Sequence, residues 1–283
     1  MINKAVYNLP FDEYRKRLGL SGSSLRYLAA SPAMYKSYLD GEIIVENQAV
    51  SLGTAIHCFL ESESLYDETF IVKNGDLDRR TKAGKEAYAE LIESGKTIIS
   101  REDDVKVRRI VKSYYNSTDP LLRMVHESPG SNETSWFWTN ADHGLQMKGR
   151  IDRIIAPNQT VCTMLAERFP SLFNPYFSNM GFEIVVDYKT TSKSISPSSF
   201  ANTIKYSGYD LAAVHYLEAT NADAFIWVVF ETVPPYGIAR YFLSQEHRFE
   251  AAARRYELIN QLAHCYETNE WPGISVTDDE TLI

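Results

Sequence analysis

The sequence predicts an α/β fold in which a mixed central β-sheet is flanked by helices. Residues 182–191 alternate with the period of a strand, so that Ile184, Val186 and Tyr188 share one face. Residues 224–233 form a continuous apolar run that is typical of a buried strand, and its hairpin partner follows directly. A long amphipathic helix comes next, and its apolar stripe is expected to be core: Phe249, Ala253, Tyr256, Ile259, Leu262, Ala263 and Tyr266.

Length and composition indicate one globular domain that spans residues 1–283. The chain is 44% hydrophobic and 23% charged, which suffices for a large core. Residues 1–130 should be mainly helical, and residues 131–283 should supply the sheet core and the C-terminal helix. No apolar stretch approaches the ~20 residues of a membrane helix, and none of signal-peptide type begins the chain. We therefore expect a soluble, cytoplasmic protein with no membrane partner.

Cysteine usage and net charge limit the classes of function. Cys58, Cys162 and Cys265 are scattered and form no C-x-x-C motif, so no disulfide framework and no zinc or iron–sulfur site is expected. The formal net charge of −8 counts against a nucleic-acid binder, because neutralising phosphates requires Lys and Arg. Net charge does not report distribution, however, since an acidic outer surface can surround a basic channel.

The N-terminal part contains a candidate phosphate site. Residues 21–24 are rich in serine and offer N-cap chemistry to a helix that includes Leu25 and Leu28. A helix N-terminus of this kind, followed by a cation, can bind a phosphate, which makes Ser24 and Arg26 candidates. A capped helix with a solvated arginine accounts for the same residues, so both interpretations stay open.

Residues 52–61 are expected to form a buried helix. His57 and Glu61 lie four residues apart and share one face of it. A lone histidine in such a helix is usually a core residue, so the spacing alone does not make His57 a ligand. Glu61 is expected to be structural.

Residues 133–152 are predicted to form a β-hairpin. Glu133 opens an aromatic strand, residues 140–144 form the turn, and the returning strand places Arg150 and Asp152 on one face. The opposite face of the returning strand should be apolar or glycine.

An Asp-x-Lys sequence follows at Asp187 and Lys189 in the strand of residues 182–191. If this strand pairs with the hairpin, Asp152 and Asp187 can converge on one point with Lys189 beside them. Carboxylate oxygens hold Mg²⁺, which polarises a phosphoryl oxygen and lowers the pKa of a bound water, and a lysine can orient that water. Taken alone, an Asp-x-Lys motif is far more often a solvated surface ion pair, because such pairs are common and contribute little to stability.

Several sequence blocks, in this order, resemble the PD-(D/E)XK nuclease superfamily, in the branch of RecB-like nucleases and exonuclease VIII (RecE). The blocks cover nearly the whole chain: Gly53-Thr54-Ala55-Ile56-His57 with Glu61, Glu133-Thr134-Ser135-Trp136-Phe137-Trp138, Lys148-Gly149-Arg150-Ile151-Asp152, Asp187-Tyr188-Lys189-Thr190-Thr191, a helix ending in Tyr216, and Trp271-Pro272-Gly273. The resemblance implies a nuclease core with a helical N-terminal part. The sequence departs from the family in two places. Residues 156–181 are an insertion where relatives have a shorter turn, and Ala212 stands where relatives carry the glutamine of a Q-x-x-x-Y pair.

The resemblance also implies a site. A Mg²⁺ ion, with Mn²⁺ as the alternative, would be held by His57, Asp152, Asp187 and the Tyr188 backbone carbonyl. Catalysis would depend on Glu133, Asp152, Asp187 and Lys189. DNA contacts would come from four residues, the first two in a pocket for a 5′-phosphate: Ser24, Arg26, Arg150 and Tyr216.

The function implied is a metal-dependent exonuclease that degrades linear double-stranded DNA from 5′ to 3′ and exposes single strands for recombination. Such proteins form homo-oligomeric rings and work beside a single-strand annealing protein, encoded by a phage or prophage and acting in the bacterial cytoplasm. Two alternatives stay open: an endonuclease or flap nuclease on the same core, and a DNA-binding or assembly module without turnover.

Overall fold

The computed structural model describes residues 3–43, 52–73, 80–170 and 182–274. Its strands are β1 (Lys4–Val6), β2 (Leu20–Ser21), β3 (Phe70–Lys73), β4 (Thr97–Ser100), β5 (Gly130–Thr139), β6 (Gln146–Ile155), β7 (Ile184–Thr191), β8 (Ala224–Glu231) and β9 (Ile238–Phe242). Over these residues the main sheet is seven-stranded, with order β1-β5-β6-β7-β8-β9 and with β2 paired to β6. β3 and β4 form a separate small sheet.

The helices begin and end close to the positions that their capping residues predict. They are α1 (Phe11–Lys16), α2 (Leu25–Ala30), α3 (Pro32–Leu39), α4 (Leu52–Glu61), α5 (Glu63–Thr69), α6 (Lys82–Glu93), α7 (Arg101–Tyr115), α8 (Pro120–Glu127), α9 (Gln159–Arg168), α10 (Pro197–Ser207), α11 (Tyr209–Thr220) and α12 (Gln245–Thr268). The Ser31 hydroxyl, for example, accepts the Met34 N–H at 3.1 Å at the start of α3. In the described part of the chain, no helix combines the length and the apolar character needed to cross a bilayer.

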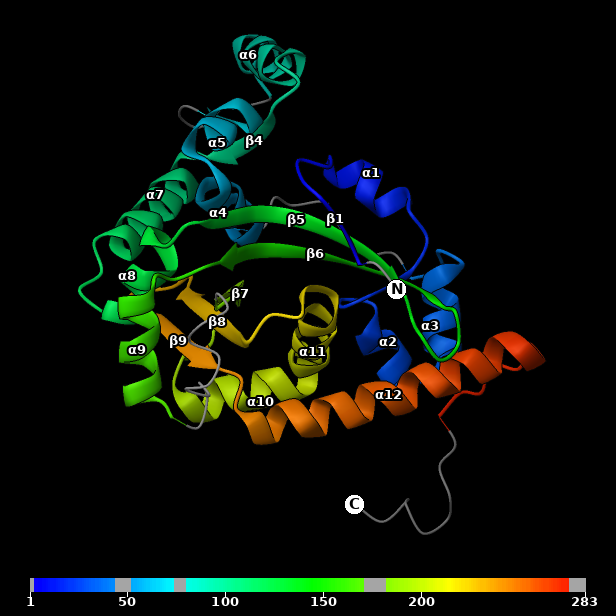
Figure 1. Ribbon diagram of the computed structural model, residues 1–283. Helices are drawn as coiled ribbons and strands as arrows, with labels where there is room; N and C mark the ends of the chain where they lie inside the picture. The colour runs from blue at the N-terminus through cyan, green and yellow to red at the C-terminus, as the bar shows by residue number, and fades with distance from the viewer. Residues whose placement is uncertain (1–2, 44–51, 74–79, 171–181, 275–283) are drawn as a thin grey trace, which may run out of the picture.

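β7 lies at the centre of the sheet and separates two cores. It pairs antiparallel with β6 and parallel with β8, so the sheet is mixed. Ile184, Val186 and Tyr188 pack with α4, α7 and α8, whereas Val185 packs with α10 and α11. Figure 1 shows α1 and α4 on one side of the sheet and α10, α11 and α12 on the other. The predicted fold class and the predicted alternation along β7 are both confirmed.

The helix that is expected to end in Tyr216 is instead a pair of helices in the connection from β7 to β8, and the second helix ends at Thr220. The chain forms α10, breaks at Gly208, and continues as α11. Gly208 has a φ of 66°, a left-handed conformation that glycine adopts at little cost. The break places Tyr209 at the start of α11, with its ring 5.0 Å from the ammonium of Lys189.

The insertion at residues 156–181 contains a helix, α9. Leu165 is fully buried in the core that α4 and α7 share. The ring of Phe169, directly after α9, lies 5.4 Å from that of Phe242 on the edge strand β9. Residues 171–181 of this insertion lie outside the described residues.

The predicted apolar stripe of α12 is only partly correct. Ile259, Leu262 and Ala263 are buried, but Phe249 is 73% exposed and Tyr256 is 55% exposed. The reason is that Arg255 occupies an inward-facing position, where it is 6% exposed and bonded to His215. Because a charged residue occupies the inward face of α12, this face does not show the apolar spacing of an amphipathic helix. The aromatic residues Phe249 and Tyr256, which suggested the stripe, lie on the exposed face instead. Two other members of the predicted stripe, Ala253 and Tyr266, are likewise exposed.

Candidate active site

Asp152 and Asp187 lie where two neighbouring strands separate. The ladder between β6 and β7 ends at the pair Arg153 and Val186, and the next residue on each strand is an aspartate. Beyond that point the Asp152 carboxylate accepts a hydrogen bond from the Tyr188 N–H at 2.7 Å. The strand pairing therefore brings the two aspartates to neighbouring positions, as the alternation pattern predicts, at a fork where the ladder between β6 and β7 ends.

Lys189 lies beside Asp187 on the same face of β7. Its Nζ is 2.5 Å from Asp187 Oδ2, and the two side chains are 23% and 9% exposed. Burial acts to lower the pKa of Lys189, but the carboxylates of Asp187 and Asp152 raise it above its ordinary value. Lys189 is therefore a charged ammonium held at the fork, with Tyr209 next to it.

His57 reaches the fork from α4. Ala55 and Ile56 anchor this helix, and both are fully buried against the β7 core. The His57 side chain is 28% exposed, and its Nδ1 lies 3.7 Å from Asp152 Oδ2. A core histidine would be buried and bonded within the protein, so the geometry places His57 among the site residues.

Glu133 reaches the same point from β5 through an unusual backbone conformation. It lies opposite Asp152, between the pairs Asn132 with Arg153 and Thr134 with Ile151, and the strand register is the same on both sides. Its φ of 48° is left-handed, which costs a non-glycine residue roughly 1–3 kcal/mol. The kink directs the Glu133 carboxylate towards Asp152 and His57.

These side chains fit a divalent cation. His57, Glu133 and Asp152 each offer one ligand atom, and the three atoms lie within 4.8 Å of one another. Burial, and then the Asp152 carboxylate, raise the pKa of Glu133 to about 7, while the Arg150 guanidinium beside it acts in the opposite direction. Two carboxylates and an imidazole suit Mg²⁺ or Mn²⁺. Asp187 is outside this trio and paired with Lys189 instead, and its part as a ligand stays a prediction together with that of the Tyr188 carbonyl.

Arg150, predicted to contact DNA, is engaged within the protein. Its Nε donates to Glu133 Oε2 at 2.5 Å, and its Nη1 donates to the Leu9 carbonyl at 2.6 Å and to the Ser135 hydroxyl at 3.3 Å. The side chain is 15% exposed. Arg150 is thus placed to fix Glu133, a role that the sequence pattern did not suggest.

Tyr216, the fourth predicted DNA contact, lies half-buried between two glycines. A Cβ atom on Gly22 would be 2.9 Å from the Tyr216 ring, and one on Gly149 would be 3.1 Å from it. The glycines therefore make room for the ring beneath β6. Ala212, one turn earlier on α11, leaves no side-chain amide there.

The structure separates the two residues of the predicted phosphate pocket. Ser24 is 2% exposed, and its hydroxyl donates to the Ser21 carbonyl at 3.0 Å, so it does not cap α2 as expected. Arg26 is exposed, and its Nη2 donates to the Tyr27 hydroxyl at 2.7 Å. Only Arg26 presents a donor group to solvent, next to the Gly208 turn.

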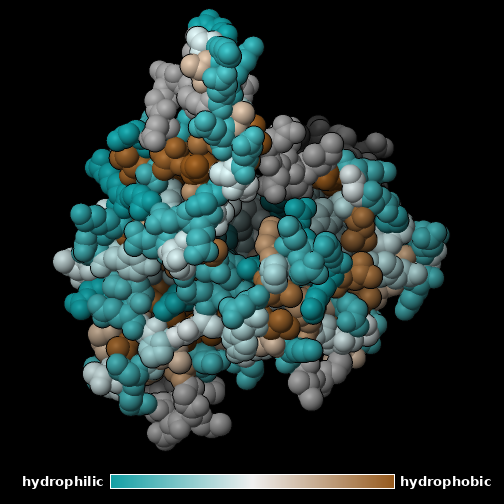
Figure 2. All heavy atoms as spheres, turned by 90° about the horizontal axis from the view of Figure 1, so that it is seen from above, coloured by the Kyte–Doolittle hydropathy of each residue, from teal (hydrophilic) through white to brown (hydrophobic). Residues whose placement is uncertain are grey.

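The face of the molecule above the sheet is hollowed. Viewed from this side, it has a hollow near its middle, bordered mainly by hydrophilic residues (Figure 2).

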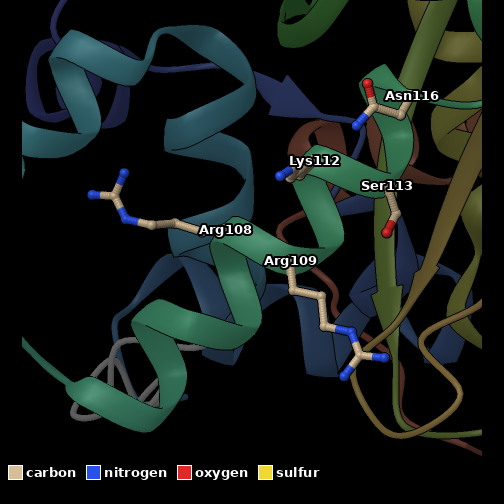
Figure 3. A pocket seen from close by; sticks show the side chains of 5 residues that line it. All are labelled: Arg108, Arg109, Lys112, Ser113 and Asn116. Atoms are coloured by element: carbon tan, nitrogen blue, oxygen red, sulfur yellow. The ribbon is translucent and has the colours of Figure 1, made fainter.

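A separate cavity of about 580 Å³ lies along α7 and has no carboxylate in its lining, which consists of Arg108, Arg109, Lys112, Ser113 and Asn116 (Figure 3). Arg108 is neutralised by three ion pairs, with Glu63, Asp67 and Asp104.

Comparison with known proteins supports the fold. No protein-family model matches the chain, and no curated protein matches it. The crystal structure of a protein from Eubacterium rectale, named "Putative exonuclease", is similar with a TM-score of 0.56 and 11% identity, over 97% of this chain and 93% of that chain. A second structure, of SSO0001, is 17% identical over 84% of this chain and 89% of that chain, with a TM-score of only 0.28. At such identity the first similarity shows a shared fold: a mixed sheet flanked by helices.

Proposed function

We propose that this protein is a metal-dependent exodeoxyribonuclease that hydrolyses phosphodiester bonds of linear double-stranded DNA. The observation that carries the proposal is the fork between β6 and β7, where Asp152 and Asp187 meet with Lys189, while His57 and Glu133 complete a cation site. The shared fold with a protein named as an exonuclease is consistent with it.

Each residue of the fork has a distinct task in this proposal. His57, Glu133 and Asp152 would hold the ion, which would supply positive charge to lower the pKa of a bound water and to neutralise the phosphate. Lys189 orients the attacking water and donates to the phosphoryl oxygen on which charge develops. Asp187, at 2.5 Å, keeps the Lys189 ammonium charged and in position.

Further parts of the proposal rest on the family resemblance alone. They are 5′ to 3′ polarity, the choice between Mg²⁺ and Mn²⁺, a homo-oligomeric ring, and an annealing partner in phage or prophage recombination in the bacterial cytoplasm. Each is independent of the fork chemistry, so the failure of any one leaves the hydrolytic site in place.

The linear and circular forms of one duplex distinguish the candidate functions. An exonuclease degrades the linear form in Mg²⁺ and leaves the covalently closed circle intact. Cutting of the circle would indicate an endonuclease instead. Binding of both forms without any cleavage, over a range of Mg²⁺ and Mn²⁺ concentrations, would leave the non-catalytic DNA-binding module.

His57→Ala should raise the metal concentration needed for half-maximal activity by at least about tenfold, because one of three closely placed ligands is lost. Since imidazole suits transition metals better than Mg²⁺, the preference between Mn²⁺ and Mg²⁺ should change as well. The measurement is a titration of cleavage rate with each metal. His264→Ala, an exposed histidine on α12, is the control. An unchanged titration with a large fall in melting temperature would return His57 to a structural role.

Arg26→Ala tests the predicted 5′-phosphate contact. The wild type should degrade a linear duplex with 5′-phosphates faster than one with 5′-hydroxyls, because a guanidinium binds the phosphate and gains little from a neutral hydroxyl. The variant should lose this difference, whereas Arg101→Ala, an exposed arginine on α7, should keep it. End-labelled time courses give both rates. Equal wild-type rates on the two substrates would remove the contact and leave the metal site unaffected.

A further inference from the structure

Two cations from β6 hold the short helix α1 onto the sheet. Lys148, 9% exposed, places its Nζ 3.4 Å from the Tyr14 carbonyl and 3.3 Å from that of Arg15, and it also donates to the Arg17 carbonyl. Arg150 donates to the Leu9 carbonyl, just before α1 begins. α1 has only six residues and buries one of them, so these contacts fix a helix that its own packing would hold weakly.

The same contacts tie α1 to the cation site. The Arg150 guanidinium that bonds the Leu9 carbonyl at 2.6 Å also bonds the Glu133 carboxylate at 2.5 Å. α1 and α4 lie on the same side of the sheet, and α4 carries His57 (Figure 1). The Arg150 side chain therefore connects the start of α1 to Glu133, a candidate ligand of the cation.

The exposed side of α1 combines an aromatic ring with cations. Phe11 is 53% exposed, and the guanidinium carbons of Arg15 and Arg150 lie 5.9 and 5.8 Å from its ring centroid. Its other neighbour is Tyr14, at 6.3 Å and an interplanar angle of 23°, so Phe11 is the outer end of a short aromatic stack.

The charges around Phe11 favour an anion. Arg15 and Arg17 are exposed and have no carboxylate partner in the described part of the chain. Lys16 is paired with Glu13 at 2.8 Å, and Asp12 is the remaining acidic residue of the helix. In a chain with a net charge of −8, α1 therefore places an exposed ring next to one guanidinium without a carboxylate partner, that of Arg15, whereas Arg150 on the other contact is bound to Glu133.

We propose that α1 binds a single-stranded segment of the nucleic acid, with one base stacked on Phe11 and an adjacent phosphate on Arg15. Stacking on an aromatic ring accepts any base, and guanidiniums add electrostatic attraction to the backbone. A base inside a duplex has both faces covered by its neighbours, so Phe11 requires an unpaired or terminal base. This surface rests on the proposed function, since it holds the strand that the fork would cut.

The test is binding of a fluorescein-labelled single-stranded oligonucleotide, measured by anisotropy in EDTA so that no cleavage occurs. Phe11→Ala should raise the Kd at least about fivefold, and Phe11→Tyr should bind like wild type, because loss of one stacked base costs ~1–3 kcal/mol. Arg15→Ala should lower the slope of log Kd against log salt by about one phosphate contact, ~0.7. Lys16→Ala, whose ammonium already has a carboxylate partner, is the matched control.

Melting temperatures and cleavage of linear duplex in Mg²⁺ are measured in parallel. A folded Phe11→Ala variant with wild-type Kd would overturn the α1 surface even if the wild type cleaves DNA. Equal weakening by Phe11→Ala and Phe11→Tyr would overturn stacking as its basis. If Phe11→Ala binds more weakly than wild type but the wild-type protein never cleaves DNA, the proposed function is wrong and the α1 surface is retained.

Discussion

Asp187→Asn and Lys189→Gln should each lower the rate of DNA hydrolysis at least about a hundredfold. Both side chains lie at the fork, 2.5 Å apart, and neither contributes to the apolar packing of β7, which Val185 and the opposite face provide. Losing Lys189 removes the donor to the developing phosphate charge. Losing Asp187 removes the carboxylate that holds this donor, along with a candidate ligand.

The measurement is single-turnover cleavage of a linear duplex at saturating protein. Amide replacements are chosen because deleting one partner of a nearly buried ion pair costs ~3–5 kcal/mol and would confuse activity with folding. Lys193→Gln, an exposed lysine just after β7, should keep the wild-type rate. Activity near that of wild type in either fork variant, with the fold intact, would remove the fork from the mechanism.

Arg255→Ala should lower the melting temperature by several degrees, since loss of this buried network should cost about 3 kcal/mol. Arg255 donates from Nε to His215 Nδ1 at 3.0 Å and from Nη1 to the Glu218 carboxylate. His215 is fully buried, and its Nε2 bonds the Lys148 carbonyl at 3.0 Å. The network therefore joins α12 and α11 to β6, the strand that carries Asp152.

Arg254→Ala is the matched control, because Arg254 is 48% exposed and makes a single surface ion pair with Asp210. Its removal should cost less than about 1 kcal/mol. Equal losses of stability in the two variants, measured by chemical denaturation, would contradict a structural role for the buried network.

The same network sets a pH dependence of stability. Burial, and then the Arg255 cation, hold the pKa of His215 well below 6.5, so His215 is neutral in the folded protein. In the unfolded chain its pKa returns to about 6.5, and the unfolded state takes up a proton that the folded state does not. Stability should thus be complete above about pH 6.5 and fall as the pH decreases below it, by at most about 1.4 kcal/mol per unit for this one group. His215→Gln should show a shallower fall, and an identical pH profile would contradict this assignment.

The sequence predicts the fork because strand alternation is a local property. Period two places Asp187 and Lys189 on one face of β7, and a hairpin followed by a third strand is enough to bring Asp152 opposite Asp187. The left-handed conformation of Glu133 could not be predicted in the same way. Glutamate has no preference for positive φ, so no local sequence signal marks this conformation. The contacts of the Glu133 carboxylate are instead with residues of other elements, among them Arg150 of β6.

The parts of the fold that the sequence does not predict are those in which buried or anchoring side chains are polar. α1 buries one residue and is held by Lys148 and Arg150, which read in the sequence as a charged strand face. Along α12, the charged residue Arg255 lies on the buried face, whereas Phe249, part of the predicted apolar stripe, lies on the exposed face. The spacing of apolar residues predicts which positions are buried by apolar packing. It cannot predict the burial of a cation whose partners are carbonyls, imidazoles and carboxylates from distant segments.

Release of nucleotides from a uniformly labelled linear duplex tests the central claim most directly, with wild-type protein in Mg²⁺, in Mn²⁺ and in EDTA. Hydrolysis at the fork between β6 and β7 predicts steady release with either metal, none in EDTA, and recovery when the metal is restored. Release that continues undiminished in EDTA, or no release with either metal from a folded protein that binds DNA, would contradict it.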